Sequence, residues 1–294
     1  MNKLTTSILL LSLGIACSGC GSNQSFVFNN IDIGKGLSAL EHTQDALTEV
    51  DETAEIALGR EIVTNLLGVA PLLENQEVQQ YVNRVGRWVS MHSERPELPW
   101  SFAVLDDDSI NAFATPGGYI VLTKGLLLTL NNEAELAGVL GHEISHVLRR
   151  HHLNALKKAS GMSALTEITD LILTAKEQST ESLKLVTAGT ELYTRGLDKE
   201  DEFESDRMGI VLATRAGYDP YGLPAALQTL EMINPDDAGL AMLFKTHPSL
   251  DERLGRLDAA MASGFDQYER LPTAKERFTR TMAGISSGLS KVKS

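Results

Sequence analysis

Two histidines and a glutamate at a fixed spacing carry the strongest chemical signal in the sequence. His142 and His146 are four residues apart, and Glu143 follows the first of them. On a helix, residues four apart share one face, so both imidazoles can bind one Zn²⁺ at about 2.0–2.1 Å. Zinc lowers the pKa of a bound water to about 7. Glu143 is turned off the metal and is placed to take a proton from that water and later to protonate the leaving amine.

The segment around this motif predicts a helix over residues 133–152. Asn132 is a suitable N-cap, with Glu135 at the third helical position. The two histidines lie beside the apolar arc, at the edge of the core, and that arc contains Leu136, Val139, Leu140, Ile144, Val147 and Leu148. Gly138 and Gly141 each cost roughly 1 kcal/mol relative to Ala in a helix. We therefore expect close backbone packing near the site.

A catalytic zinc site needs a third protein ligand and one open position. Glu202 is the best candidate, and Asp206 lies one turn further along the same helix face, where it can hydrogen-bond a ligand histidine. Glu204 is the main competitor, although it points to a different face. The alternative to a ligand is an exposed acidic helix start, where carboxylates favour the helix dipole.

Composition limits the classes of protein that fit. The chain has 294 residues, enough for one large domain or two small ones, and its 43% hydrophobic and 22% charged residues are typical of a globular protein. The net charge of −13 argues against a nucleic-acid partner, which favours a basic surface.

The first residues resemble a bacterial lipoprotein signal. Lys3 precedes an apolar run over residues 8–16 that is too short to span a bilayer, and Cys17 and Cys20 follow. We favour lipidation of Cys20, and Gly21 after it favours the outer membrane by resemblance to Gram-negative lipoproteins. The alternatives are lipidation of Cys17 or an ordinary cleaved signal peptide. Loss of residues 1–19 would leave Cys20 as the one cysteine, so that no internal disulfide could form.

Periodicity and turn residues predict the remaining elements. Helices are expected over residues 52–67, 77–92, 197–216, 222–233 and 251–262, and short strands over 100–105, 110–115 and 119–123. Residues 155–200 have a weak helical pattern. Pro116-Gly117-Gly118 predicts a turn between the last two strands, either of which can hold a substrate at a sheet edge or belong to a plain core hairpin. His151 and His152 are expected to be capping or solvated residues.

Several motifs occur together in one order: Glu55–Leu58-Gly59, Asn111-Ala112-Phe113, His142-Glu143-Ile144-Ser145-His146, Glu202-Phe203-Glu204-Ser205-Asp206 and His247-Pro248-Ser249. This set, over residues 50–262, resembles the zinc metallopeptidases related to the heat-shock protease HtpX and the CAAX prenyl endopeptidases. It is most similar to their soluble periplasmic members of the BepA and LoiP type. One departure is Ser205, where Ala is usual.

The resemblance implies a gluzincin fold, α+β and mostly α, with a small mixed sheet beside the zinc helix. It places one Zn²⁺ on His142, His146 and Glu202. It implies that Asp206 supports a ligand and that His247 can fill the open position in a self-inhibited resting state. Arg253 is expected to contact substrate or an oxyanion, or to lie on a solvated face. The expected division is a signal peptide (1–19), a tether (20–50), the metallopeptidase domain (51–262) and a basic tail or peripheral helix (263–294).

These expectations predict a metalloendopeptidase of the bacterial envelope. It would be periplasmic and held to the outer membrane by its lipid anchor, with misfolded or stalled envelope proteins as substrates and no nucleic-acid partner. The alternative is a chaperone-like binding lipoprotein with a latent protease site. A purely structural zinc protein is disfavoured because such sites are usually closed by Cys or by a fourth side chain.

Overall fold

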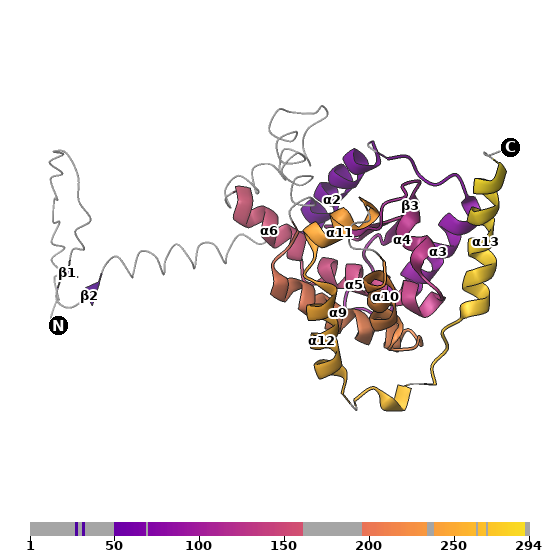
Figure 1. Ribbon diagram of the computed structural model, residues 1–294. Helices are drawn as coiled ribbons and strands as arrows, with labels where there is room; N and C mark the ends of the chain where they lie inside the picture. Colours follow the sequence, from indigo (N-terminus) through magenta and orange to yellow (C-terminus); the bar gives the residue numbers. More distant parts are fainter. Residues whose placement is uncertain are drawn as a thin grey trace, which may run out of the picture. The chain divides into compact units, whose positions relative to one another are not determined.

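The computed structural model describes residues 27–28, 31–32, 50–68, 70–160, 196–233, 238–262, 264–268 and 270–291 (Figure 1). The chain divides into two units, Met1–Thr48 and Glu49–Ser294. In the first unit, strands β1 (Val27–Phe28) and β2 (Ile31–Asp32) pair antiparallel. The cysteines of the predicted lipoprotein signal lie outside the described residues, as do residues 161–195 of the weakly patterned segment.

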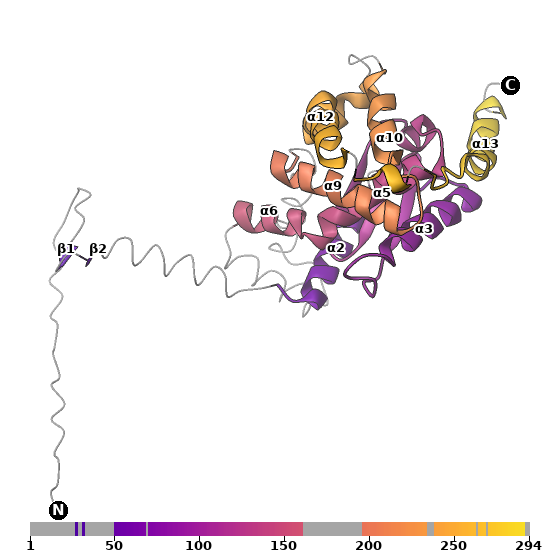
Figure 2. The ribbon, with the colours of Figure 1, turned by 90° about the horizontal axis from the view of Figure 1, so that it is seen from below.

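The second unit is mostly helical and is built around α5 (Glu133–Leu148). Helices α3 (Gln76–Ser90), α9 (Lys199–Arg215) and α10 (Gly222–Glu231) pack against α5 (Figures 1 and 2). Every residue of α5 except Leu148 is buried. The N-cap expectation is confirmed, because the Asn132 side chain accepts a hydrogen bond from the Glu135 N–H at 3.0 Å. The zinc motif therefore lies on a helix that is surrounded by others.

A small mixed sheet lies beside this helix. Its order is β3 (Ser101–Leu105), β5 (Tyr119–Thr123), β4 (Ala112–Thr115), with β5 parallel to β3 and antiparallel to β4. The predicted turn joins β4 to β5 with Gly117 at φ 76° and Gly118 at φ 100°. Because β5 is paired on both sides, the suggestion that it offers an edge to substrate is wrong, and of the two candidates only β4 lies at an edge. The predicted fold class is confirmed.

Two glycines bring α5 and α9 into backbone contact. A Cβ on Gly141 would lie 2.6 Å from the Gly209 carbonyl oxygen, and one on Gly209 would lie 2.7 Å from the His142 nitrogen. Gly138 approaches Leu223 of α10 in the same way. The expected close packing is confirmed, and it allows side chains of α9 to reach those of α5.

The helix predicted over residues 133–152 is broken. It ends at Leu148, and α6 (His151–Ser160) begins after Arg150, whose φ of 56° is left-handed. Such a φ is uncommon for a non-glycine residue. The buried carboxylate of Glu55 accepts from Arg150 Nε at 3.1 Å and thus stabilises the turn. His151 and His152 are buried as a result, so the expectation of solvated side chains is wrong.

Further helices of this unit come before and after α5 in the chain. They are α2 (Glu52–Leu67), α4 (Lys124–Thr129), α11 (Ala241–Thr246) and α12 (Leu250–Met261), with 3₁₀ turns at Ala238–Leu240 and Asp266–Tyr268. The bounds of α2 agree with the prediction, whereas neither α4 nor α11 was predicted. Among the residues that the structure describes, no helix has the length and apolar character needed to cross a membrane.

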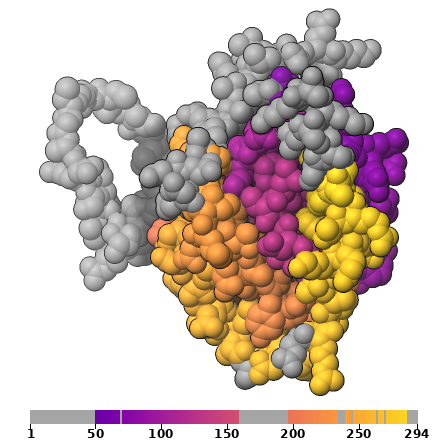
Figure 3. Space-filling view, turned by 45° about the vertical axis from the view of Figure 1, so that its right-hand side comes forward, coloured from indigo at the N-terminus to yellow at the C-terminus, as the bar shows by residue number. Residues whose placement is uncertain are grey.

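The C-terminal segment contains α13 (Lys275–Lys291), which packs against α3 and α5. Its Phe278, Met282 and Ile285 are buried in the main core. Figure 3 shows the yellow surface of this helix between the magenta and indigo surfaces of earlier parts of the chain. Of the two forms expected for residues 263–294, the structure thus has a helix, and this helix shares the core.

Candidate metal centre and active site

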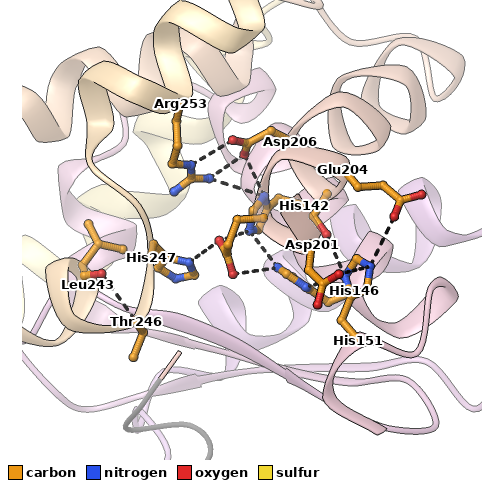
Figure 4. A network of polar contacts seen from close by, with 12 residues as sticks. His142, His146, His151, Asp201, Glu204, Asp206, Leu243, Thr246, His247 and Arg253 are labelled. Carbon is orange, nitrogen blue, oxygen red and sulfur yellow. Dashed lines mark hydrogen bonds and ion pairs between the residues drawn. The ribbon is translucent and has the colours of Figure 1, made fainter. Parts of the chain in front are cut away.

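The side chains of His142 and His146 on α5 meet that of Glu202 on α9, the helix packed against α5. Figure 4 shows both histidines in the network of polar contacts at this place. The two imidazole Nε2 atoms lie 3.0 Å apart. Glu202 Oε2 lies 3.6 Å from Nε2 of His142, and Oε1 lies 3.6 Å from Nε2 of His146. All three residues are at most 3% exposed. One buried carboxylate therefore faces both nitrogen atoms.

This arrangement fits a zinc ion. Two nitrogen ligands at about 2.0–2.1 Å in a tetrahedron lie about 3.4 Å apart, close to the spacing of the two Nε2 atoms. Two imidazoles and a carboxylate are a donor set that zinc accepts. Burial alone raises the pKa of Glu202, but the charges of His247 and His146 and hydrogen bonds from histidines lower it well below the usual range. The carboxylate is therefore anionic at neutral pH, as a metal ligand must be.

Asp206 and Arg253 fix the ring of His142 through the nitrogen that faces away from the metal site. Asp206 Oδ1 lies 2.9 Å from His142 Nδ1. Arg253, from α12, donates to both Asp206 oxygens, from Nε at 2.9 Å and from Nη2 at 2.6 Å. This contact leaves Nε2 of His142 directed at the site and fixes the ring.

The carboxylates around His142 favour a positive charge on or beside its ring. Burial opposes protonation of the ring, but hydrogen bonds to Asp206 and Glu202 outweigh it and raise the pKa of His142 to about 9. Arg253 is buried and engaged with Asp206. The suggested solvated face is therefore wrong for Arg253, while its contact with substrate stays a prediction.

His247 reaches the same carboxylate from the loop after α11. Its Nδ1 lies 2.5 Å from Glu202 Oε2, and one ligand atom from each of His142, Glu202 and His247 lies within 4.8 Å of the others. Figure 4 shows the His247 ring directed toward the His142 side chain, and the two ring centroids lie 5.8 Å apart. The structure thus places His247 where it can act as a further ligand or as a cover.

Glu143 lies between two cavities beside the site. One is lined by polar groups together with β4, and the other is lined mainly by leucines of α4, α10 and α11. Both are partly open to solvent, and both are also bordered by His247. Burial raises the pKa of Glu143, against the opposing charges of His142 and His247. A carboxyl with a raised pKa is suited to accept and return a proton near neutrality.

Glu204, the other candidate for the third ligand, points away from the two motif histidines. Glu204 Oε1 lies 3.0 Å from Arg149 Nε, and its other oxygen lies 3.4 Å from His151 Nε2. Because Glu204 and Glu202 are two residues apart on α9, they face different directions. The geometry therefore supports Glu202 rather than Glu204.

Sequence reasoning missed two buried groups at the site. His151 Nδ1 lies 3.0 Å from His146 Nδ1. On an unbroken helix, residues five apart are turned about 140° from each other, so only the break at Arg150 brings these rings together. Asn111 Oδ1 lines the polar cavity and, among the described residues, is the buried side-chain oxygen without a hydrogen-bond partner. No motif signals the break, because neither Gly nor Pro occurs there.

The comparison with known families matches residues 73–261 to Peptidase family M48. The chain belongs to this family. The M48 chain is 32% identical over 235 residues to the beta-barrel assembly-enhancing protease of Escherichia coli, covering 76% of this chain and 48% of that protein. It is 28% identical to the mitochondrial metalloendopeptidase OMA1 of Arabidopsis thaliana (62% and 36%) and 27% identical to a protease HtpX homolog of Salinibacter ruber (63% and 74%).

The M48 chain spans about half the length of the beta-barrel assembly-enhancing proteases that it matches. The resemblance drawn from the motifs is confirmed at the level of the family. Family M48 implies a zinc site, and the cluster of His142, Glu202 and His247 is present where such a site is expected.

Proposed function

We propose that this M48 chain is a zinc-dependent endopeptidase. The observation that carries the proposal is the convergence of both motif histidines and Glu202, with buried Glu143 beside them. One zinc ion would be held by His142, His146 and Glu202. When bound, zinc supplies the Lewis acidity that polarises a peptide carbonyl and acidifies water.

The side chains then have distinct tasks. Glu143 takes the proton of the attacking water and returns it to the nitrogen of the leaving amine. Asp206, held by Arg253, keeps His142 in the tautomer that directs Nε2 at the metal. Glu143 borders the two cavities through which, in this proposal, the substrate would approach.

The test is one set of measurements on purified protein: zinc content and casein cleavage for the wild type and Glu143→Gln. We expect full zinc and loss of cleavage in the variant, because Gln cannot accept the proton. Cleavage at the wild-type rate in Glu143→Gln would contradict the mechanism. Zinc content reports whether the variant has kept its metal.

The envelope role rests on the N-terminal signal and on the relatives. Cys20 is the proposed lipidation site, and lipidation there would hold the enzyme in the periplasm at the outer membrane. The Escherichia coli relative is named a beta-barrel assembly-enhancing protease. Misfolded or stalled envelope proteins are the proposed substrates. Labelling with a radioactive fatty acid in cells tests the anchor: Cys20→Ser should lose the label and Cys17→Ser should keep it. The reverse pattern would move the anchor to Cys17.

A second candidate is a chaperone-like binding lipoprotein with a latent protease site. The contact between His247 and Glu202 favours it, since a covered site cleaves little. Casein cleavage by His247→Ala separates the two candidates. Cleavage supports the endopeptidase, whereas full zinc without cleavage supports the binding protein.

A further inference from the structure

His151 is in direct contact with the second motif histidine. Its Nδ1 lies 3.0 Å from Nδ1 of His146, and both side chains are buried, with His151 at 4% exposed. Figure 4 shows the two rings side by side, with His146 between His151 and the site. The Nδ1 atom of His146 thus contacts an imidazole, whereas the Nδ1 atom of His142 contacts the carboxylate of Asp206.

The direction of this hydrogen bond is set by what His146 does on its other side. A neutral imidazole carries its proton on one nitrogen and offers a lone pair on the other. If Nε2 of His146 binds a metal, its proton lies on Nδ1 and is donated. His151 Nδ1 must then accept, so the proton of His151 lies on Nε2.

The surroundings of His151 match that assignment. Its Nε2 lies 3.4 Å from Glu204 Oε2 and 3.7 Å from Asp201 Oδ1, both on α9. These carboxylates attract an N–H at Nε2. Arg149 holds Glu204 in place through a 3.0 Å contact with its other oxygen. The Ser205 hydroxyl, 3.3 Å from His151 Nδ1, can donate to the same lone pair.

We propose that His151 is a positioning residue: it accepts a hydrogen bond from Nδ1 of His146 and thereby keeps Nε2 of His146 free for zinc, while Glu204 and Asp201 keep the proton of His151 on its own Nε2. This inference rests on His146 being a zinc ligand, as proposed above. The break at Arg150 has a purpose in this arrangement, because only a new helix beginning at His151 brings this ring back to His146.

The experiment compares three variants. His151→Leu removes the acceptor and keeps an apolar side chain, and His151→Gln keeps an acceptor oxygen. His92→Leu is the matched control, because His92 hydrogen-bonds the Trp88 carbonyl near the end of α3 rather than a group of the site. For each variant we would measure the zinc dissociation constant by competition with a chromophoric chelator and the melting temperature of the zinc-free protein.

Loss of an outer hydrogen-bond partner typically weakens metal binding by about 10–100-fold. We expect a loss in this range for His151→Leu, an intermediate value for His151→Gln and wild-type affinity for His92→Leu. Wild-type affinity in His151→Leu would overturn the proposal. So would a Gln variant as weak as the Leu variant, since restoring an acceptor would then have no effect.

A spectroscopic measurement on the wild type tests the same proposal and does not depend on whether the variants fold. Long-range ¹H–¹⁵N NMR of the zinc-loaded protein distinguishes the two tautomers of each imidazole. The proposal requires the proton of His146 on Nδ1 and that of His151 on Nε2; a proton on Nδ1 of His151 overturns it. Neither this spectrum nor zinc affinity depends on substrate. Absence of casein cleavage by the wild type would therefore contradict the proposed endopeptidase and leave this inference intact.

Discussion

His247 Nδ1 lies 2.5 Å from Glu202 Oε2, so the loop after α11 contacts the carboxylate that faces both histidines of the zinc motif. The loop ends at Ser249, which caps α12 by accepting from the Glu252 N–H. Arg253, which binds Asp206, lies on the first turns of that helix. A shift of this loop therefore changes the surroundings of two groups at the site.

Removing His247 should raise peptidase activity. In His247→Ala the contact with Glu202 is lost and substrate gains access to the site. If one molecule in ten is open in the wild type, cleavage should rise about tenfold, in proportion to the open fraction. The measurement is the rate of casein cleavage, with His92→Ala as the control. A rate at or below the wild type, with full zinc, would argue against a covering role.

The single variant Asp206→Leu should lose more unfolding free energy than the double variant that carries both Asp206→Leu and Arg253→Met. The single change leaves the buried guanidinium of Arg253 without its carboxylate, which typically costs about 3–5 kcal/mol, whereas replacing both partners by apolar groups costs less. Urea unfolding of the zinc-free proteins gives the free energies. Equal losses for the single and double variants would contradict the prediction that the unpaired guanidinium is what destabilises Asp206→Leu.

Gly141→Ala should both destabilise the fold and lower zinc content. The new methyl meets the Gly209 backbone, which cannot move aside like a side chain, and overpacking of this kind costs about 1–3 kcal/mol. Separation of α5 from α9 moves His142 away from Glu202. Gly255→Ala on α12 is the matched control, since its Cβ meets open space and should add about 0.5–1 kcal/mol of stability. Equal behaviour of the two variants would contradict the packing argument.

Ionised Glu133 should contribute to the free energy of unfolding of the wild type, and this contribution should disappear in acid. Burial raises the pKa of Glu133, but hydrogen bonds from Arg277, Tyr81 and Tyr218 outweigh it and lower the pKa below its usual range. A carboxyl with a lowered pKa stabilises the fold above its unfolded value of about 4.3, and this stability is lost as the pH falls through the folded value. The gap in unfolding free energy between wild type and Glu133→Gln should therefore narrow from pH 6 to pH 3.

The control for this comparison is Glu276→Gln, an exposed change on α13 beside Arg277. Its gap to the wild type should stay small and nearly constant over the same range. All samples would contain a chelator, so that loss of zinc in acid does not enter the comparison. A gap for Glu133→Gln that is constant with pH would contradict the lowered pKa.

Local patterns in the sequence were sufficient for several of the elements and for the central histidines. The periodicity of residues 52–67 gave the correct bounds of α2, and Asn132 marked the start of α5. The i, i+4 spacing placed His142 and His146 on one face, as found. Gly141 indicated close packing, although the partner helix was beyond reach of a local pattern.

Features that depend on contacts between distant segments were not predictable in this way. The left-handed turn at Arg150 is stabilised by Glu55, which is almost one hundred residues earlier in the chain, and so the neighbours of Arg150 give no sign of it. The burial of His151 follows from that turn. The centre of the sheet is set by parallel pairing of β3 with β5, which no turn motif reveals.

The position of α13 has a practical consequence for truncation of the protein. The match to family M48 ends at residue 261, yet Arg277 donates to both oxygens of Glu133, the first residue of α5. An expression clone ending near residue 262 would leave that buried carboxylate without its cation and would uncover the apolar surface that Phe278 now fills. Soluble, crystallisable protein should therefore require the chain to continue through Ile285, the last of these buried residues and well past the segment that family membership alone would suggest.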